Sequence, residues 1–306
     1  MTNFFEKMMF SPQWYHYFII VLFFPFSVIY GIIMLARRLA TRKQNFGIPI
    51  VSVGNLIVGG SGKTPFVIAL ASRYQDVAVI SRGYGRQSKG LIEVSQKGKI
   101  LTTVEQSGDE PMLMAKSLVN ASVIVSEDRH SAIELAKKQG AKLIILDDGF
   151  NRVEIKKFEI LLEPESIKNY CPFPSGAFRE FCFMKKYADI LAKEGRDFVR
   201  EVSFEDLTER MVLVTAISNP ARLDKYLPDN IVEKIYLEDH AYFDEEILKK
   251  ALSDNNATSI ICTSKDIMKM QGFKLPISEI KLKLEIQNQI FITIENYIQN
   301  YKEECF

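Results

Sequence analysis

The sequence has little of what marks several common classes of protein. Its 306 residues include three histidines and one tryptophan, and 39 lysine and arginine residues nearly balance 38 aspartate and glutamate residues. Without a basic excess, nucleic acid is not expected as a main partner. The four cysteines form no Cys-x-x-Cys pair and no metal-finger spacing, so they are expected to be reduced, mostly buried thiols of a cytoplasmic chain. The sequence also shows no internal repeat, low-complexity tract or metal-binding cluster.

A glycine-rich segment between a predicted strand and a predicted helix is the most informative feature. The apolar run 48–53 predicts a buried strand, and residues 65–74 predict a helix that begins with proline. Strand, glycine-rich loop and helix in this order are the context of a phosphate-binding loop, whose backbone N–H groups and helix N-terminus attract an anion. The residues expected to bind the nucleotide are Ile57, Val58, Gly59, Gly60, Ser61, Gly62, Lys63 and Thr64.

Two side chains of this loop have specific expected roles. Lys63, expected to be an exposed loop residue, would reach the β- and γ-phosphates, and the hydroxyl of Thr64 would hold Mg²⁺. The strict loop pattern has glycine where Ile57 stands. An ordinary strand–helix turn is therefore the alternative interpretation.

Polar residues follow two further predicted strands. The apolar strand 142–146 ends at Asp147 and Asp148, which is the form of a second nucleotide motif whose aspartate serves the Mg²⁺ site. The strand 76–80 ends in the loop 81–86, where open parallel sheets place ligand residues. Ordinary turns are the alternative in both places. The alternation of strands and helices from residue 48 to 146 indicates a parallel sheet with helices on both faces.

Asp109 and His240 are open to two interpretations each. Asp109 precedes the predicted helix 112–118 and is either its N-cap or a functional carboxylate. His240 lies beside acidic residues after the predicted strand 231–237 and is either functional or a surface histidine. Other predicted strands are 121–125, 158–162, 188–192, 211–216, 259–263 and 281–286, and other predicted helices are 131–139 and 291–301.

The N-terminal stretch 11–36 contains no charged residue and is rich in aromatic residues. As a helix it is long enough to cover the hydrocarbon core of a bilayer, and the basic residues Arg37, Arg38, Arg42 and Lys43 follow it directly. This pattern predicts a membrane helix with the rest of the chain on the cytoplasmic side. A buried core helix and a helix lying in one leaflet are the alternatives.

Taken together, the motifs resemble the tetraacyldisaccharide 4′-kinase (lipid A 4′-kinase) family. The resemblance rests on ordered segments across nearly the whole chain, namely 53–65, Ser81-Arg-Gly-Tyr-Gly85, Gly108-Asp-Glu-Pro111, Asp147-Asp-Gly-Phe150, Ser175-Gly-Ala-Phe-Arg-Glu180, Ala216-Ile-Ser-Asn-Pro220, Asp239-His240 and Thr263-Ser-Lys-Asp266. The family loop also lacks the first glycine of the strict pattern. Three departures concern local substrate contacts: Asn151-Arg152 replaces Gln-His of the family, Phe178 replaces a leucine before Arg179, and Ser264 replaces a glutamate.

The resemblance implies transfer of the ATP γ-phosphate to the 4′-hydroxyl of a tetraacyldisaccharide 1-phosphate, a lipid A precursor, at the cytoplasmic face of the inner membrane. It implies Asp109 as the base paired with His240, and Asp147 and Asp148 with Thr64 at the Mg²⁺ site. Inner-membrane lipid is the other expected partner, and no obligate protein partner is evident. The implied contacts to phosphates or acceptor sugar are Ser81, Arg82, Tyr84, Arg179 and Glu180.

The expected fold is α/β: a parallel-sheet domain like that of P-loop NTPases, an N-terminal membrane helix and a second, smaller α/β domain. The expected boundaries are 1–36 for the helix, 37–153 for the kinase core, 154–286 for the second domain and 287–306 for a helix that returns to the core. The alternative function is a membrane-tethered P-loop GTPase or ATPase switch. A GTPase should carry Asn-Lys-x-Asp to read guanine, and the nearest segment, 263–266, lacks the asparagine.

Overall fold

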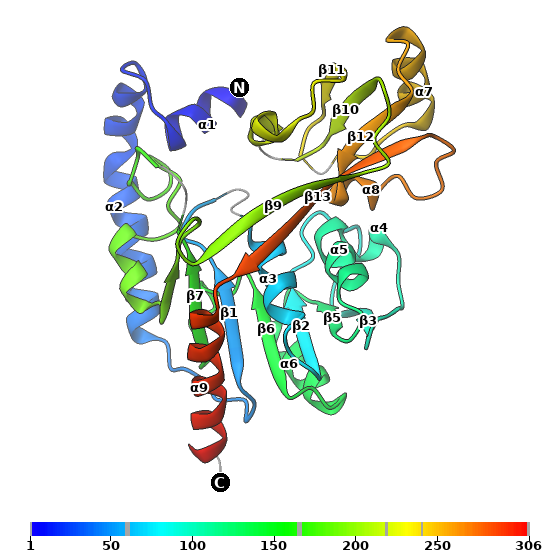
Figure 1. The fold of residues 1–306 in the computed structure, drawn as a ribbon. Helices are drawn as coiled ribbons and strands as arrows, with labels where there is room; N and C mark the ends of the chain where they lie inside the picture. The colour runs from blue at the N-terminus through cyan, green and yellow to red at the C-terminus, as the bar shows by residue number, and fades with distance from the viewer. Residues whose placement is uncertain (1, 59–61, 164–166, 218–219, 240, 305–306) are drawn as a thin grey trace. The chain divides into compact units, whose positions relative to one another are not determined.

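Strands and helices alternate along much of the chain, as expected for an α/β fold (Figure 1). The computed structural model describes residues 2–58, 62–163, 167–217, 220–239 and 241–304. The chain divides into two units that each combine distant segments. Unit 1 is Met1–Lys63, Lys142–Val199 and Ile286–Phe306, and unit 2 is Thr64–Ala141 and Arg200–Glu285. The domain boundaries expected from the sequence stay a prediction.

Unit 1 contains four parallel strands in the order β6-β1-β7-β8. They are β6 (Leu143–Asp147), β1 (Ile50–Gly54), β7 (Phe158–Leu162) and β8 (Ile190–Ala192). Every residue of β6, β1 and β7 is buried. Strands covered on both faces read as continuous apolar runs, which is why the sequence predicts these three correctly.

The helices of unit 1 come from both ends of the chain (Figure 1). They are α1 (Thr2–Phe10), α2 (His16–Ala40) and α9 (Asn288–Glu304), with a short 3-10 helix at Cys182–Tyr187. Helix α2 contains Pro25 and begins later than the uncharged stretch does. Helix α9 was expected to return to the first domain, and the hydroxyl of Tyr297 donates a 3.2 Å hydrogen bond to the carbonyl oxygen of Ile50 in β1.

The first half of unit 2 contains four strands in the order β4-β3-β5-β2. Strands β2 (Val77–Ser81) and β5 (Ser122–Val125) are parallel, whereas β3 (Ile92–Gln96) runs antiparallel to β5 and to β4 (Lys99–Ile100). The helices are α3 (Lys63–Ala71), α4 (Val104–Ser107), α5 (Asp109–Ser117) and α6 (Arg129–Lys138). The β3–β4 hairpin is not among the elements that the sequence predicts.

The second half of unit 2 is a five-stranded sheet in the order β11-β10-β12-β13-β9. Its strands are β9 (Phe198–Glu205), β10 (Met211–Thr215), β11 (Ile231–Tyr236), β12 (Ser259–Thr263) and β13 (Ile277–Ile286), and its helices are α7 (Glu245–Asp254), α8 (Ser264–Ile267) and the 3-10 helix Pro220–Tyr226. Strands β10, β11, β12 and β13 are consecutive parallel neighbours. Their carboxyl ends therefore meet at one edge, where α/β sheets place ligand-binding residues.

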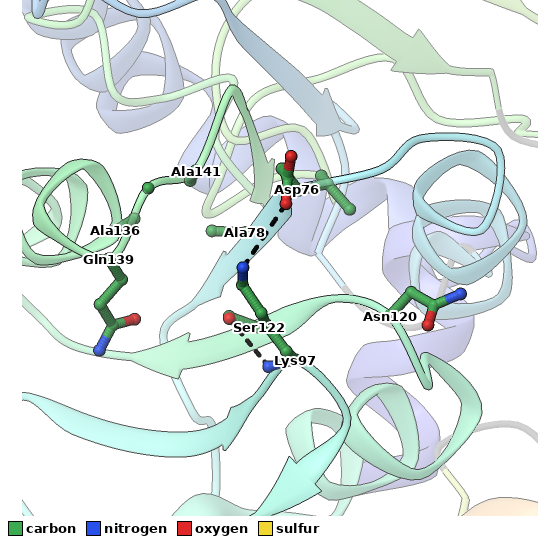
Figure 2. A pocket seen from close by; sticks show the side chains of 10 residues that line it. Asp76, Ala78, Lys97, Asn120, Ser122, Ala136, Gln139 and Ala141 are labelled. Carbon is green, nitrogen blue, oxygen red and sulfur yellow. Dashed lines mark hydrogen bonds and ion pairs between the residues drawn. The ribbon is translucent and has the colours of Figure 1, made fainter.

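In the first half of unit 2, a small hollow lies at the amino ends of the parallel strands β2 and β5 (Figure 2). Asp76, Lys97 and Asn120 line it, and an ion pair of 3.7 Å joins Asp76 to Lys97. Its volume of about 10 Å³ has room for roughly one water molecule. Ligand sites of parallel sheets form at the carboxyl ends of the strands, so this hollow is no candidate for the nucleotide.

Candidate active site

The phosphate-binding loop and the acidic pair leave the same edge of the unit 1 strands. Strand β1 is parallel to β6, with Val53 opposite Asp147 in the register. Both segments therefore begin side by side at the carboxyl ends of adjacent strands. Gly54 is needed at this edge, because a Cβ atom there would lie 2.7 Å from the Cβ of Phe150. Gly59, Gly60 and Ser61 lie outside the described residues.

Ile57 and Val58, the first residues of the loop, pack against the rest of unit 1. Ile57 is buried in an apolar cluster with Phe150 and Phe178, and the amide of Val58 donates a 2.9 Å hydrogen bond to the carbonyl oxygen of Ala177. A large apolar residue replaces the first glycine of the strict pattern because this position fills a core. A direct role in nucleotide binding for the Ile57 and Val58 side chains stays a prediction.

A chain of charged contacts connects the loop to the acidic pair. The Nζ atom of Lys63 lies 3.4 Å from Oδ1 of Asp148 and donates a 3.1 Å hydrogen bond to Oδ1 of Asn55. Nη1 of Arg179 lies 2.7 Å from Oδ2 of the same aspartate. Lys63 is not the exposed residue expected from the sequence, because its side chain is only 13% exposed. The structure thus brings together Lys63, Asp148 and Arg179, which the sequence proposed separately.

Asp148 is held in its ionised form. Burial opposes ionisation, but the charges of Lys63 and Arg179 outweigh burial and hold the pKa of the carboxyl group below its usual value. Its backbone has a φ of 54°, in the left-handed region, which aspartate tolerates better than most residues. A carboxylate kept charged beside two cations suits a site for phosphates and a metal ion.

The acidic pair offers ligands of the kind that Mg²⁺ prefers. Asp147 is buried at the end of β6, and Asp148 follows it directly. Magnesium is usually held by one or two carboxylates together with phosphate oxygens and water. Within the described part of the chain, no three histidine, cysteine, aspartate or glutamate residues are grouped to hold a metal ion. Two adjacent carboxylates at a strand end fit a Mg²⁺ ion that phosphate oxygens also bind. Thr64 is the second residue of α3 and is half-buried.

Arg38, near the C-terminal end of α2, binds Glu180 and the carbonyl oxygen of Phe150, which follows the acidic pair. Nη2 of Arg38 lies 2.9 Å from Oε1 of Glu180, its Nε donates a 3.1 Å hydrogen bond to Oε2, and the guanidinium lies 4.4 Å from the ring centroid of Phe150. The two charged side chains are 7% and 5% exposed. Glu180, expected to contact substrate, thus has Arg38 as its bidentate partner. Arg38 belongs to the basic cluster that follows the apolar stretch, and its side chain is buried.

Breaking this pair is expected to destabilise the protein. Arg38→Met should lower the free energy of unfolding by about 3–5 kcal/mol, because Glu180 would remain as a buried, unpaired charge. Denaturant unfolding followed by circular dichroism measures the change. Arg38→Met combined with Glu180→Leu should recover most of the loss. The control Lys185→Met removes the half-exposed pair with Glu163 and should change stability by less than about 1 kcal/mol. Equal losses in Arg38→Met and Lys185→Met would contradict the expectation.

Unit 2 holds a second charged cluster around Asp109. Helix α5 begins at Asp109, and its N-cap is Gly108, whose φ is 88°. The interpretation of Asp109 as the N-cap is therefore wrong. The carboxylate instead lies 3.2 Å from Nζ of Lys269 and 3.5 Å from Nζ of Lys265. The sequence did not single out either lysine for this role.

The loop after β2 lies next to the start of α5. A Cβ atom on Gly108 would lie 2.8 Å from the carbonyl oxygen of Tyr84, so glycine is required there. Arg82 and Tyr84 are exposed, and the guanidinium lies 6.0 Å from the ring centroid. Ser81 is buried, and its carbonyl oxygen accepts a 2.9 Å hydrogen bond from Arg129. The roles of Arg82 and Tyr84 as substrate contacts stay predictions, and His240 lies outside the described residues.

Asp266 argues against the guanine-reading alternative. It is buried and accepts hydrogen bonds from the hydroxyl of Thr215 at 2.7 Å and from the amide of Ala216 at 3.0 Å. It also forms a capping box with Thr263 at the start of α8. These bonds fasten the ends of β10 and β12 to α8. An aspartate engaged in this way is a structural residue and is not presented to a base.

Comparison with known proteins agrees with this geometry. The family profile described as tetraacyldisaccharide-1-P 4′-kinase matches residues 19–299. A protein named tetraacyldisaccharide 4′-kinase from Helicobacter acinonychis (strain Sheeba) is 48% identical over 300 residues, which cover 97% of this chain and 96% of that protein. A protein of the same name from Aliarcobacter butzleri (strain RM4018) is 42% identical over 308 residues, with 97% of each chain covered.

A solved structure shares both fold and sequence with the chain. The crystal structure of the "apo" form of LpxK from Aquifex aeolicus in complex with ATP matches with a TM-score of 0.75 and 27% identity. The match covers 92% of this chain and 99% of that chain. The predicted α/β fold class is confirmed. The chain belongs to the tetraacyldisaccharide 4′-kinase family.

Proposed function

We propose that this protein transfers the γ-phosphate of ATP to the 4′-hydroxyl of a tetraacyldisaccharide 1-phosphate in lipid A biosynthesis. Family membership supports the reaction. The observation that carries it within the structure is the contact of Lys63 with Asp148 where β1 and β6 end side by side. Phosphoryl transfer depends mainly on positioning and on neutralising charge, which this arrangement can supply.

The unit 1 residues would act on the nucleotide. Lys63 would exchange Asp148 for phosphate oxygens and neutralise their charge, and Asn55 would keep the lysine oriented. Asp147, Asp148 and Thr64 would hold Mg²⁺, which when bound neutralises the phosphates. Arg179 remains beside Asp148 and would contact a phosphate in the same place. Loop residues 57–64 would surround the phosphates.

The unit 2 residues would act on the acceptor. Asp109 would take the proton of the 4′-hydroxyl, and His240 would orient it. An ordinary aspartate is a weak base for an alcohol, with a pKa of roughly 4, but the proton can move late in such a reaction. Ser81, Arg82 and Tyr84 of unit 2 and Glu180 of unit 1 stay proposed substrate contacts. Arg82 and Tyr84 are exposed to solvent, whereas Ser81 and Glu180 are buried. We also propose a kinase core at 37–153 and a second domain at 154–286.

The reaction can be tested directly. Purified protein is incubated with radiolabelled ATP and tetraacyldisaccharide 1-phosphate, and the lipid is extracted. Labelled glycolipid is the expected result. Phosphate release that needs no acceptor, with no labelled lipid, would instead favour the nucleotide switch.

We propose that the protein works at the cytoplasmic face of the inner membrane, with α2 lying in one leaflet. Helix α2 is the one helix among the described residues that is long and apolar enough to cross a membrane. One face of α2 contacts the 175–180 segment of unit 1 along most of the length of the helix. Ser175 donates hydrogen bonds to the carbonyl oxygen of Ile20 and, through its amide, to the hydroxyl of Ser27, and Arg38 binds Glu180.

These contacts extend from residue 20 to residue 38, and these 18 steps along the helix correspond to roughly 27 Å. The segment 171–181 that covers this side is not helical, so a full span would carry its polar backbone groups into the hydrocarbon. The other side of α2 exposes large apolar side chains such as Phe18, Val21 and Phe26. A helix with one apolar face free and one face bound to protein suits insertion into a single leaflet.

If α2 lies in one leaflet, both of its ends are on the same side of the membrane. If α2 spans the bilayer, its ends are on opposite sides. Ser11 and Arg42 flank the helix and are both exposed. We expect Ser11→Cys and Arg42→Cys to react with a membrane-impermeant maleimide from the cytoplasmic side, in inverted vesicles and not in intact spheroplasts. The unsubstituted protein corrects for its own cysteines. Labelling of the two positions from opposite sides would show a full span.

A further inference from the structure

Two lysines one helical turn apart converge on the carboxylate of Asp109. Lys265 lies in α8, and Lys269 lies two residues beyond the end of this helix. Both Nζ atoms approach the same oxygen, Oδ2 of Asp109, at 3.5 Å and 3.2 Å. The side chain of Lys269 is 4% exposed and that of Asp109 is 2% exposed. Charges this deeply buried interact far more strongly than surface charges do.

The same lysines hold the segment on either side of position 240. Nζ of Lys265 lies 3.7 Å from Oδ1 of Asp239. Nζ of Lys269 donates a 3.2 Å hydrogen bond to the carbonyl oxygen of Ala241 and lies 5.8 Å from the ring centroid of Tyr242. Each lysine thus connects Asp109 in α5 with a residue adjacent to His240 in the chain.

The lysines are themselves held in place. Asp266 lies between them in sequence, and its carboxylate accepts hydrogen bonds from Thr215 and Ala216 at the end of β10. Its capping box with Thr263 fixes the start of α8. The two ammonium groups are therefore presented from a rigid turn at the carboxyl edge of the five-stranded sheet.

Two lysines contact Asp109, and two further carboxylates contact one of these lysines. Lys265 and Lys269 face the carboxylate directly, while Glu110 and Asp239 share Lys265, at 3.2 Å and 3.7 Å. Burial lowers the pKa of Lys265, but the carboxylates of Glu110, Asp109 and Asp239 outweigh it and hold that pKa above its usual value. Lys269 is the closer of the two cations to Asp109 and has no other acidic partner among the ion pairs of the described residues.

We propose that Lys269, assisted by Lys265, is a positioning residue that keeps the Asp109 carboxylate ionised and aligned with the segment that carries His240. The role rests on the proposed function, in which Asp109 accepts the proton of the sugar hydroxyl. A buried carboxylate remains charged only with opposite charges beside it. Without Lys269 the base would be protonated over more of the pH range. Its link to Ala241 would be lost, and only the longer contact of Lys265 with Asp239 would remain.

The test compares Lys269→Met with the parent enzyme across pH, with ATP and tetraacyldisaccharide 1-phosphate as substrates. We expect kcat to fall about 10- to 100-fold near neutral pH, with the KM for ATP almost unchanged. The acid limb of the kcat profile should move to higher pH, so that the loss shrinks as pH rises. Lys269→Arg keeps the charge and should retain the parent's acid limb.

Two further variants keep the test decisive. Lys265→Met removes the longer contact and should move the acid limb in the same direction by less, which carries the test if Lys269→Met does not fold. The matched control Lys249→Met removes exposed ion pairs on α7 and should leave the profile unchanged. An acid limb that stays in place in both lysine variants, or a loss equal at all pH values, would overturn the proposal. A parent enzyme that labels no lipid would instead overturn the proposed function.

Discussion

Replacing Lys63 with alanine is expected to lower the rate of phosphoryl transfer by at least about 10²- to 10³-fold, the loss typical of a removed charge-stabilising donor. Lys63 is the first residue of α3, and its ammonium group already contacts a carboxylate that phosphate oxygens would replace. Single-turnover transfer from radiolabelled ATP measures the effect on the chemical step.

The same substitution should leave the fold intact. Asp148 would keep its 2.7 Å contact with Arg179 and is partly open to solvent, so no buried charge is left alone. The melting temperature is therefore expected to change little. Lys97→Ala is the control, because Lys97 forms an exposed ion pair with Asp76 far from the carboxyl ends of β2 and β5. Near-normal turnover in Lys63→Ala would remove the nucleotide interpretation of the loop.

The strands whose residues are all buried are predicted from the sequence, as are the partly exposed strands β8 and β11. Strands β1, β6 and β10 read as continuous apolar runs because no face of them meets water. Strand β9 was missed because it alternates buried and exposed residues and carries charges on its open side. Its alternation was a usable signal. Helix α7 also had a usable sequence signal, because Asp244 caps the helix and two glutamates occupy its first turn.

The proximity of Lys63 to Asp148 could be predicted because both residues follow neighbouring parallel strands. The contacts that support the site could not. Arg38 and Glu180 are 142 residues apart, and Lys265 and Glu110 are 155 apart. Periodicity and local motifs describe neighbours along the chain. They carry no information about which distant charge will occupy a buried pocket, so the partners of Glu180 and Asp109 come from the structure alone.

The replacement of Asp109 by asparagine is expected to lower turnover by about 10²- to 10⁴-fold, because asparagine cannot accept the hydroxyl proton. The affinity for ATP should change little, since Asp109 is proposed to act on the acceptor. Single-turnover rates and ATP binding measured on the same sample separate the two effects.

Stability needs its own measurement in this variant. Asparagine leaves Lys269, whose side chain is 4% exposed, without its carboxylate, so Asp109→Asn should also lower the melting temperature. Adding Lys269→Met removes the buried cation and should restore much of the stability while leaving the rate as low as in Asp109→Asn alone. Residues that act as one unit are non-additive in this way. A double variant that is stable and still slow would show that the rate loss comes from the missing base. Recovery of turnover together with stability would mean that Asp109 serves only to pair with Lys269, and the mechanism would need another base.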